Sequence, residues 1–158
     1  MEPLVATLIE YFDYLPEKGL LIRRKSTANC NSAGDILNPT RGHITFSGVD
    51  YDYATLCWVV YHKRFPKGIV DHKDRTRYNH DITNLREATP TQNQQNKAGY
   101  GTYSKGVTWR NRKEYPWQAK IRVNGDRIHL GSFETEEEAA EAYRQAAIQY
   151  HGEFACLE

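Results

Sequence analysis

The sequence predicts an α+β protein built from two small domains, and three observations lead to this prediction. Residues 117–123 alternate between apolar and polar side chains, which is the period of a half-buried strand. Thr89 and Thr135 are each followed three residues later by a glutamine or glutamate, which marks the start of a helix. Two glycines within residues 99–101 interrupt the pattern between these regions, and 158 residues suffice for two small domains.

The first stretch, residues 1–67, is expected to form short strands, because alternating residues are separated by turn-forming glycines. A short helix is expected over Ala54–Lys63, ending before a Phe-Pro-Lys-Gly segment. The apolar residues that this helix offers for burial are Leu56, Trp58, Val59 and Val60. We interpret this stretch as scaffold.

The middle stretch is expected to fold as strand, loop, strand and helix. Ile69–His72 is the first strand, residues 73–81 are a turn-rich loop, and Ile82–Ala88 is the second strand. Thr89 is expected to cap the helix, with a proline at the first helical position.

The last stretch is expected to form three strands and a helix. The core face of the strand at residues 117–123 is expected to hold Trp117, Ala119, Ile121 and Val123, opposite Gln118, Lys120 and Arg122. A tight turn at Asn124-Gly125 or Gly125-Asp126 leads to a strand with Ile128 and Leu130 inside and Arg127 and His129 outside. A helix then runs from Thr135 to about Gly152. The residues expected on its buried face are Ala139, Ala142, Tyr143, Ala146 and Tyr150.

Charge is distributed unevenly, although the formal net charge is only +1. Residues 103–133 hold seven basic and two acidic side chains, a local charge of +5, whereas residues 134–158 hold seven acids against Arg144 alone. A basic segment is typical of nucleic-acid binding, since cationic side chains release counterions from phosphate.

Composition argues against several other classes of protein. No apolar run approaches the roughly 18 to 20 residues that span a bilayer, and residues 1–22 carry acids where a signal peptide has a basic start, so we expect a cytoplasmic protein without a membrane partner. Cys30, Cys57 and Cys156 are odd in number and far apart, which argues against a disulfide framework and against a structural zinc module.

The chemistry that the sequence offers is concentrated after residue 70. Hydrolysis of a phosphodiester needs a base to activate water and a cation held by ligands that leave it open to substrate. Asp71 and His72 are neighbours on a strand and therefore point to opposite sides, so one can bind metal while the other faces the phosphate. Asn84 lies twelve residues after His72, and Asn93 lies twenty-one after it, in the first turns of the helix.

Together, V-D-H, I-x-N-L-R and the Asn-bearing helix resemble the ββα-metal motif of HNH endonucleases, in the variant with Asn as the third residue. The resemblance implies Asp71 and Asn93 as metal ligands, His72 as general base, and Asn84 as the residue that orients the His72 ring. It also implies a divalent metal, Mg²⁺ or Mn²⁺, no small-molecule cofactor, and a mobile or phage-encoded homing-type enzyme in a bacterial host. The region before the motif resembles phage-type HNH proteins, with Ala54-Thr55 where an H-R pair is expected.

Other polar residues near the motif allow more than one interpretation. His80 is interpreted as a loop residue rather than a third ligand, and Arg86 either meets phosphate or forms a structural ion pair. His43, His62 and His151 are interpreted as structural or solvated.

Residues 104–158 resemble the APETALA-two/ethylene-response-factor DNA-binding domain over about 55 residues. The motifs that carry this resemblance are Lys105-Gly106-Val107, Trp117-x-Ala119-x-Ile121-Arg122, Leu130-Gly131-x-Phe133 and Glu138-Ala139-Ala140-x-Ala142-Tyr143. It implies a three-stranded antiparallel sheet packed on one helix, with the sheet in the major groove of double-stranded DNA. The matching DNA-contact positions are Lys105, Thr108, Arg110, Lys120, Arg122, Arg127 and His129. Thr108, Lys120 and His129 depart from the family's usual Arg, acid and Trp, so a different base preference is expected.

The expected organisation is an HNH domain over residues 1–97 with its motif at 69–97, a linker at 98–103, and a DNA-binding domain at 104–158. The expected function is metal-dependent DNA cleavage with a histidine base, targeted by the second domain, in an oligomeric state that the sequence leaves open. The rival is a sequence-specific DNA-binding regulator with a decayed nuclease site, which the presence of both Asp71 and His72 disfavours.

Overall fold

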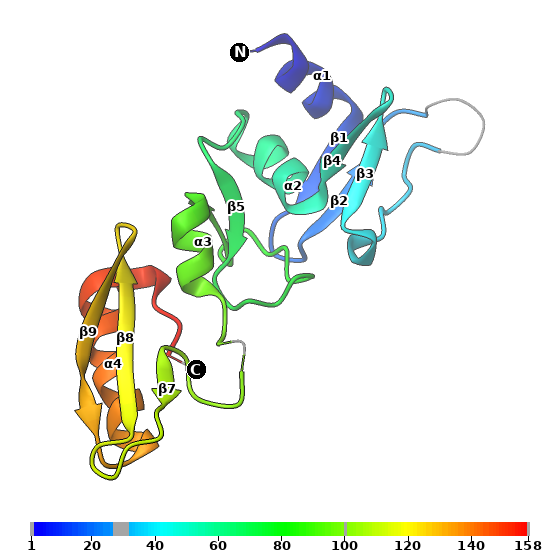
Figure 1. Cartoon of the computed structure of the whole chain (residues 1–158). Helices are drawn as coiled ribbons and strands as arrows, with labels where there is room; N and C mark the ends of the chain where they lie inside the picture. Colours follow the sequence, from blue (N-terminus) through cyan, green and yellow to red (C-terminus); the bar gives the residue numbers. More distant parts are fainter. Residues whose placement is uncertain (1, 27–31, 100, 158) are drawn as a thin grey trace. The chain divides into compact units, whose positions relative to one another are not determined.

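The computed structural model describes residues 2–26, 32–99 and 101–157 (Figure 1). The chain divides into two compact units, residues 1–89 and residues 90–158. By its contacts the helix that starts at residue 90 therefore groups with the second unit, whereas the sequence prediction placed it in the first. Within the predicted linker at 98–103, residue 100 lies outside the described residues, as does Cys30 in the first unit.

The first unit combines two α-helices and a 3-10 turn with short antiparallel strands in its described residues. Its elements are α1 (Pro3–Tyr11), β1 (Phe12–Leu15), β2 (Leu20–Arg23), η1 (Pro39–Arg41), β3 (His43–Phe46), β4 (Val49–Asp52), α2 (Tyr53–His62), β5 (Ile69–His72) and β6 (Leu85–Ala88). The strands pair as β1 with β2, β3 with β4, and β5 with β6, each pair antiparallel. The sequence predicted these short strands but not the helix α1.

Helix α1 forms because a proline stands at its N-terminus and its apolar residues are spaced for one helical face. Val5 and Leu8, three residues apart, are 1% and 0% exposed. Helix α1 ends at Phe12, which begins β1.

Helix α2 lies within one residue of its predicted position. The carboxylate of Asp52 accepts a hydrogen bond from the backbone N–H of Thr55 at 2.9 Å and caps the start. Lys63 adopts a left-handed conformation with φ 57° and closes the end. Leu56, Trp58 and Val59 are buried as predicted, and they join a core that includes α1, the β1–β2 pair and the β3–β4 pair.

The β5–β6 hairpin pairs Asp71 with Arg86 and His72 with Leu85. Strand β5 has its predicted bounds, but β6 starts three residues later than predicted. Residues 81–84 form a turn instead, because the Asp81 carboxylate accepts hydrogen bonds from the backbone N–H and the hydroxyl of Thr83. The apolar Ile82 lies in this turn and does not begin the strand.

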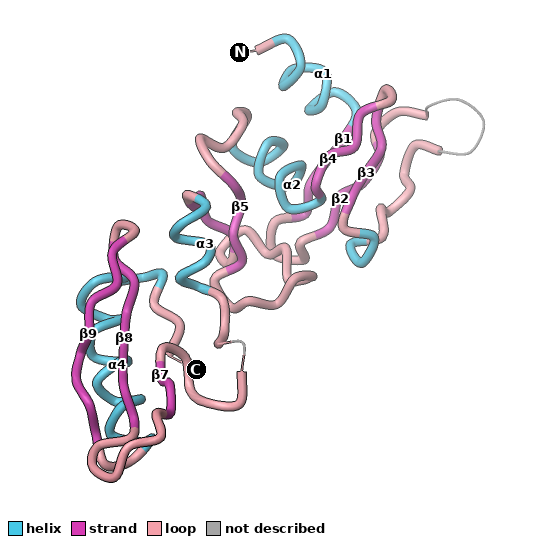
Figure 2. The backbone as a smooth tube through the Cα atoms, in the orientation of Figure 1, coloured by secondary structure: helices cyan, strands magenta, loops and turns pink. Residues whose placement is uncertain are grey.

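The second unit contains a three-stranded antiparallel sheet packed on one long helix, which confirms the predicted α+β class and this arrangement. Its elements are α3 (Pro90–Asn96), β7 (Val107–Trp109), β8 (Trp117–Val123), β9 (Asp126–Phe133), α4 (Glu136–His151) and η2 (Gly152–Phe154). The strand order is β7-β8-β9. Figure 2 shows the strands of this sheet alongside α4.

Strand β8 has its predicted bounds and its predicted inner face. Ala119 and Ile121 are 0% and 2% exposed, and both pack toward α4. Of the two possible turns, the structure has Asn124-Gly125, with positive φ angles of 52° and 97° as a tight hairpin turn requires. A register shift between Ala119 and Lys120 marks an irregularity in the β8–β9 ladder.

Helix α4 begins and ends as predicted, with the Thr135 hydroxyl accepting from the N–H of Glu138 and Gly152 at the C-cap. Tyr143 is buried, but Tyr150 is 45% exposed and its predicted burial is wrong. Gly106, with φ 75°, allows the β7 end of the sheet to approach this helix, because a Cβ there would lie 2.1 Å from the Tyr143 ring. No helix in the described part of the chain is long and apolar enough to cross a membrane.

Candidate functional site

Asp71 lies in a buried ion pair. Its carboxylate oxygen Oδ2 accepts from Nε of Arg86 at 2.9 Å and lies 2.9 Å from Nη2 of the same guanidinium. The two side chains are only 6% and 9% exposed. Of the two interpretations of Arg86, the structure therefore has the ion pair, and it follows directly from the strand register that places Arg86 opposite Asp71.

His72, the next residue of β5, is half-buried, and its ring meets another histidine. Nε2 of His72 lies 3.1 Å from Nδ1 of His80. Burial lowers the pKa of His72 below its ordinary value, against the opposing effect of nearby carboxylates, of which Asp52 is the strongest. The ring is therefore neutral near pH 7, as a general base must be before it takes a proton.

His80 lies in the loop between β5 and β6, as interpreted from the sequence, and it is buried there, with 3% of its surface exposed. Its ring stacks on Tyr53 with centroids 4.5 Å apart, and its Nε2 lies 3.4 Å from the carbonyl oxygen of Pro39. The hydroxyl of Tyr14 donates to the backbone carbonyl of His80. Burial lowers the pKa of His80, while the hydrogen bond to Pro39 acts in the opposite direction.

Asn84 holds the loop between the strands. Its Oδ1 accepts from the N–H of Asp74 at 3.0 Å, and its Nδ2 donates to the Asp74 carboxylate at 2.9 Å and to the carbonyl of Asn79 at 2.7 Å. All of these contacts go to the loop between the strands, and none goes to the ring of His72. Any effect of Asn84 on that ring passes through the loop that carries His80.

Asn93 lies on α3 and is half-buried. The helix starts at the predicted Pro90, which places Asn93 in its first turns as expected. Its role as a metal ligand together with Asp71 stays a prediction.

The donor atoms suit a hard divalent cation. In the described residues no three His, Cys, Asp or Glu side chains gather as a metal-binding group, so a protein cage of the zinc type is absent from this part of the chain. Nε and Nη2 of Arg86 both lie against Oδ2 of the Asp71 carboxylate. A carboxylate and an amide oxygen, completed by water and phosphate, fit Mg²⁺ or Mn²⁺.

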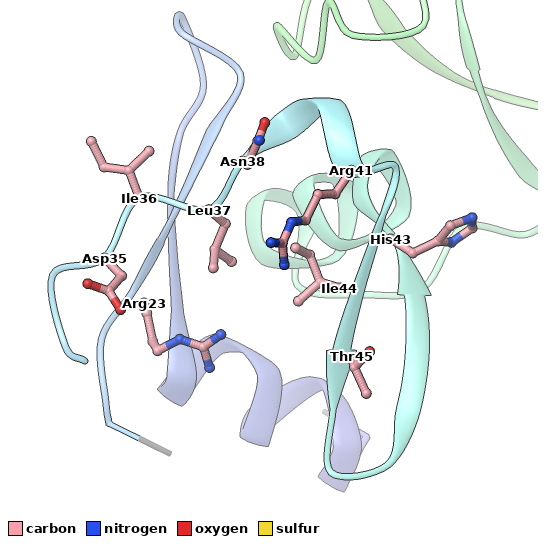
Figure 3. Close-up of a pocket in the computed structure, with 9 residues that line it drawn as sticks. All are labelled: Arg23, Asp35, Ile36, Leu37, Asn38, Arg41, His43, Ile44 and Thr45. Carbon is pink, nitrogen blue, oxygen red and sulfur yellow. The ribbon is translucent and has the colours of Figure 1, made fainter. Parts of the chain in front are cut away.

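A polar pocket of about 490 Å³ lies elsewhere in the first unit, between the end of β2 and the start of β3 (Figure 3). Figure 3 shows the side chains of Arg23 and Arg41 extending toward its centre. One wall is formed by the segment around η1, which also supplies the Pro39 carbonyl near His80. The sequence did not indicate this pocket, because it is formed by several short segments and no local sequence pattern shows that they come together.

The outer face of the second sheet carries most of the predicted DNA-contact residues. Thr108, Arg110, Arg122, Arg127 and His129 are exposed, and Lys120 is half-buried. Across the β8–β9 ladder Lys120 lies opposite His129, and Arg122 lies opposite Arg127. Gln118, in the middle strand of the same face, is only 8% exposed.

Lys105 differs from the other predicted DNA contacts. Its ammonium group donates to the carbonyl of Gln95 at 2.6 Å and to the carbonyl of Lys97. Lys105 therefore binds the C-terminal end of α3, where a cation is favoured by unpaired carbonyls and by the helix dipole.

Comparison with known proteins assigns both parts of the chain. Residues 56–95 match the HNH endonuclease family. An uncharacterized HNH endonuclease of Acanthamoeba polyphaga mimivirus is 40% identical over 86 residues, which are 54% of this chain and 44% of that protein. The matched segment includes α2, the β5–β6 hairpin and most of α3.

The C-terminal region is similar to plant proteins. An AP2-like ethylene-responsive transcription factor of Arabidopsis thaliana is 54% identical over 50 residues, 30% of this chain and 10% of that protein. A second one from the same plant is 39% identical over 92 residues, 57% of this chain and 15% of that protein. The chain spans less than half the length of the viral relative and a small fraction of the plant relatives, and no solved structure matches it significantly.

The chain therefore contains a segment that matches HNH endonucleases, followed by a region similar to AP2-like domains. Both resemblances found in the sequence are confirmed.

Proposed function

We propose that this protein is a DNA endonuclease in which the HNH-like segment, residues 56–95, cleaves phosphodiester bonds and the AP2-like domain selects the DNA. The observation that carries the proposal is the neutral, half-buried His72 beside Asp71 within the segment that matches HNH endonucleases. No other described segment combines these features.

In the proposed reaction His72 takes a proton from water as the water attacks phosphorus. Asp71 and Asn93 would hold a divalent cation, Mg²⁺ or Mn²⁺, and that cation would supply positive charge near the leaving 3′ oxygen. Arg86 fixes the direction of the Asp71 carboxylate through the two contacts to Oδ2. Asn84 keeps the loop between the strands in place.

The sheet of the second unit supports DNA as the partner. Arg122 and Arg127 lie directly opposite each other on neighbouring strands, and like charges in this position destabilise a sheet. A phosphate backbone or a guanine edge relieves that repulsion, and arginine forms bidentate contacts with both. The proposed contacts are Thr108, Arg110, Lys120, Arg122, Arg127 and His129.

We also infer a homing-type enzyme of a mobile or phage element that acts in the cytoplasm of a bacterial host. Support comes from the combination of one cleavage segment with a separate sheet for reading sequence, which together give a long target. The rival, a DNA-binding regulator with a decayed site, predicts binding without cleavage.

The test is a cleavage assay on a DNA library with Mg²⁺, with Mn²⁺ and with EDTA, beside His72→Ala. The proposal requires cutting that stops in EDTA and falls by about 10² to 10⁴ in the variant, because removal of a general base has this effect. Binding of DNA by the variant should stay close to that of the parent. Cutting at the parent rate by His72→Ala would refute the assignment, and binding without any cutting favours the regulator.

A further inference from the structure

We propose that His80 is the positioning residue for His72: Nδ1 of His80 accepts the hydrogen bond from Nε2–H of His72 and thereby leaves the proton-accepting nitrogen of His72 at Nδ1. This inference rests on the proposed function for its catalytic meaning. The hydrogen bond itself can be tested without any cleavage.

The direction of the hydrogen bond follows from the atom on the far side of His80. The carbonyl oxygen of Pro39 can only accept, so Nε2 of His80 carries the hydrogen that points to it at 3.4 Å. A neutral imidazole has one N–H, and Nδ1 of His80 therefore has a lone pair. At 3.1 Å from that lone pair, Nε2 of His72 must be the donor.

This assignment decides which nitrogen of His72 is the base. With the hydrogen on Nε2, the lone pair of His72 is on Nδ1. Without a fixed partner the ring could exchange tautomers and rotate, and a proton transfer to Nδ1 would lose its alignment. The lowered pKa of His80, caused mainly by burial, keeps the accepting ring neutral.

His80 is itself held from several directions, as a positioning residue must be. Tyr53 stacks on its ring at 4.5 Å, and Tyr14 donates to its backbone carbonyl. Gly19, with φ 63°, brings the β1–β2 turn against the backbone of His80, where a Cβ would lie 2.6 Å from the carbonyl carbon. The N–H of Ile82 donates to the carbonyl of Pro16 at 3.1 Å and ties the same loop to that turn.

Asn84, the residue expected to orient His72, directs its hydrogen bonds to the loop instead. Its amide oxygen and both amide hydrogens bond to Asp74 and Asn79. Asn84 and His80 have complementary roles. Asn84 holds the loop in shape, and His80, which lies in that loop, contacts the ring of His72. A histidine with only a structural role would stack on Tyr53 in the same way. The test must therefore distinguish the effect of the His80 ring nitrogens from the effect of the ring's shape.

Three variants of the full chain make that separation. His80→Phe keeps a ring against Tyr53 but has no nitrogen. His80→Asn offers an oxygen close to the place of Nδ1. Tyr14→Phe removes one hydrogen bond to the backbone of His80 and leaves both rings intact, so it controls for a general loosening of the loop.

The first measurement is a through-hydrogen-bond ¹⁵N–¹⁵N coupling between Nε2 of His72 and Nδ1 of His80, in metal-free protein at pH about 8, where imidazoles are neutral. We expect the coupling in the parent and in Tyr14→Phe. The second measurement is single-turnover cleavage with Mg²⁺. His80→Phe should cut about 10- to 100-fold more slowly, the usual effect of losing a partner that orients a histidine, with DNA affinity unchanged. His80→Asn should recover part of the loss, and Tyr14→Phe should cut at nearly the parent rate.

Several results would overturn the inference. Absence of the coupling in a parent that cleaves DNA removes the hydrogen bond and leaves the proposed nuclease standing. Equal loss of rate in His80→Phe and His80→Asn, or in Tyr14→Phe and His80→Phe, assigns His80 a structural role only. A parent that shows the coupling and cuts no DNA overturns the proposed function and, with it, the catalytic meaning of the pair.

Discussion

The buried pair of Asp71 and Arg86 links stability and chemistry at a single carboxylate. The two side chains are buried against each other, and removing one partner of a buried ion pair leaves an uncompensated charge. The same guanidinium fixes the direction of the Asp71 carboxylate through Oδ2. Strand register, which is a backbone property, therefore determines how the proposed metal ligand is presented.

We predict that Arg86→Gln lowers the free energy of unfolding by about 3 to 5 kcal/mol, because it leaves the Asp71 charge buried without a cation. Urea unfolding at neutral pH measures this. Arg144→Gln is the matched control, since it breaks the exposed Arg144–Glu141 pair and should change the free energy of unfolding far less. Equal effects of the two substitutions would contradict the structural role of the buried pair.

We predict that Asp71→Asn binds the divalent metal more weakly and therefore needs more metal for cleavage, because an amide is a poorer ligand for a hard cation than a carboxylate. Mn²⁺ binding to the protein–DNA complex, followed by electron paramagnetic resonance, should weaken in Asp71→Asn and stay unchanged in His72→Ala. The cleavage rate as a function of Mg²⁺ concentration should shift in the same way. Unaltered Mn²⁺ binding in Asp71→Asn would place the metal elsewhere.

The sequence predicted Asp71 and His72 as strand neighbours with different surroundings, and the structure agrees. It did not predict the partner of His72. His80 lies in a loop without periodicity, and its burial depends on Tyr14, Tyr53 and Pro39, which lie 27 to 66 positions away in the sequence. Local pattern contains no information about such contacts, whereas Asp71 and His72 belong to a short motif that is recognisable by itself.

At the scale of elements, Glu87 connects β6 to the segment after α2. Its two carboxylate oxygens accept from Arg64 at 2.7 Å and 2.8 Å, and one also accepts from the N–H of Lys67. The hydrogen bonds from Arg64 are the main reason that the pKa of Glu87 falls from 4.5 to about 2. These contacts hold the entry of β5 beside the exit of β6.

We predict that Glu87→Gln destabilises the protein at neutral pH and that the difference from the parent disappears in acid. A carboxylate whose folded pKa lies below its unfolded value stabilises the fold above the unfolded value, here 4.5, and loses that effect as pH falls toward 2. Thermal unfolding of both proteins between neutral pH and pH about 2 measures the difference. Glu17→Gln, at an exposed glutamate of the β1–β2 turn, controls for the loss of a surface charge. A difference that stays constant with pH would contradict the assignment.

For the sheet of the second unit we predict three distinct responses. Arg122→Ala should cost roughly 1 to 3 kcal/mol of DNA binding and relax specificity at one position, as expected for a base-reading arginine. Lys120→Ala should weaken all sequences about equally and reduce the salt slope by about one. Lys105→Ala should leave the salt slope closer to that of the parent, because its ammonium binds carbonyls of α3.

Fluorescence anisotropy of labelled duplexes over a range of salt concentrations measures these responses. If Lys105→Ala reduced the salt slope as much as Lys120→Ala, its ammonium would have to leave α3 when DNA binds. If neither lysine affected the slope, phosphate contact by this sheet would be wrong.

Elements with a strong local pattern were predictable, and elements determined by neighbours were not. Strand β8 and the Asn124-Gly125 turn follow from alternation and turn chemistry alone. The start of β6 was misplaced because Asp81 binds Thr83 and makes a turn from residues that read as strand. Helix α1 was missed because residues 3–11 carry only a short apolar face.

At the scale of the whole molecule, helix α3 groups with the second unit by its contacts, whereas most of its sequence lies in the segment that matches HNH endonucleases. It contacts η2, and Lys105 binds its last carbonyls, while residues 56–95 include most of it. A helix of seven residues has little stability of its own, because isolated helices shorter than about 12 to 15 residues are marginal in water. The helix that carries Asn93 therefore depends on residues of the AP2-like domain.

The last prediction concerns fragments of the chain. A fragment that ends at Lys97 contains every proposed catalytic and metal residue but lacks Lys105 and η2, so α3 should lose its order and cleavage should fall far below that of the full chain. A fragment of residues 90–158 should bind DNA in a salt-dependent way without cutting it. Circular dichroism of both fragments establishes that each is folded, and cleavage assays on a library measure rate and site choice.

If the first fragment cut with the rate and site choice of the full chain, α3 would not need the second unit, and the dependence of Asn93 on that unit would be wrong. If the second fragment showed no salt-dependent binding, the basic sheet would not be the surface that selects DNA.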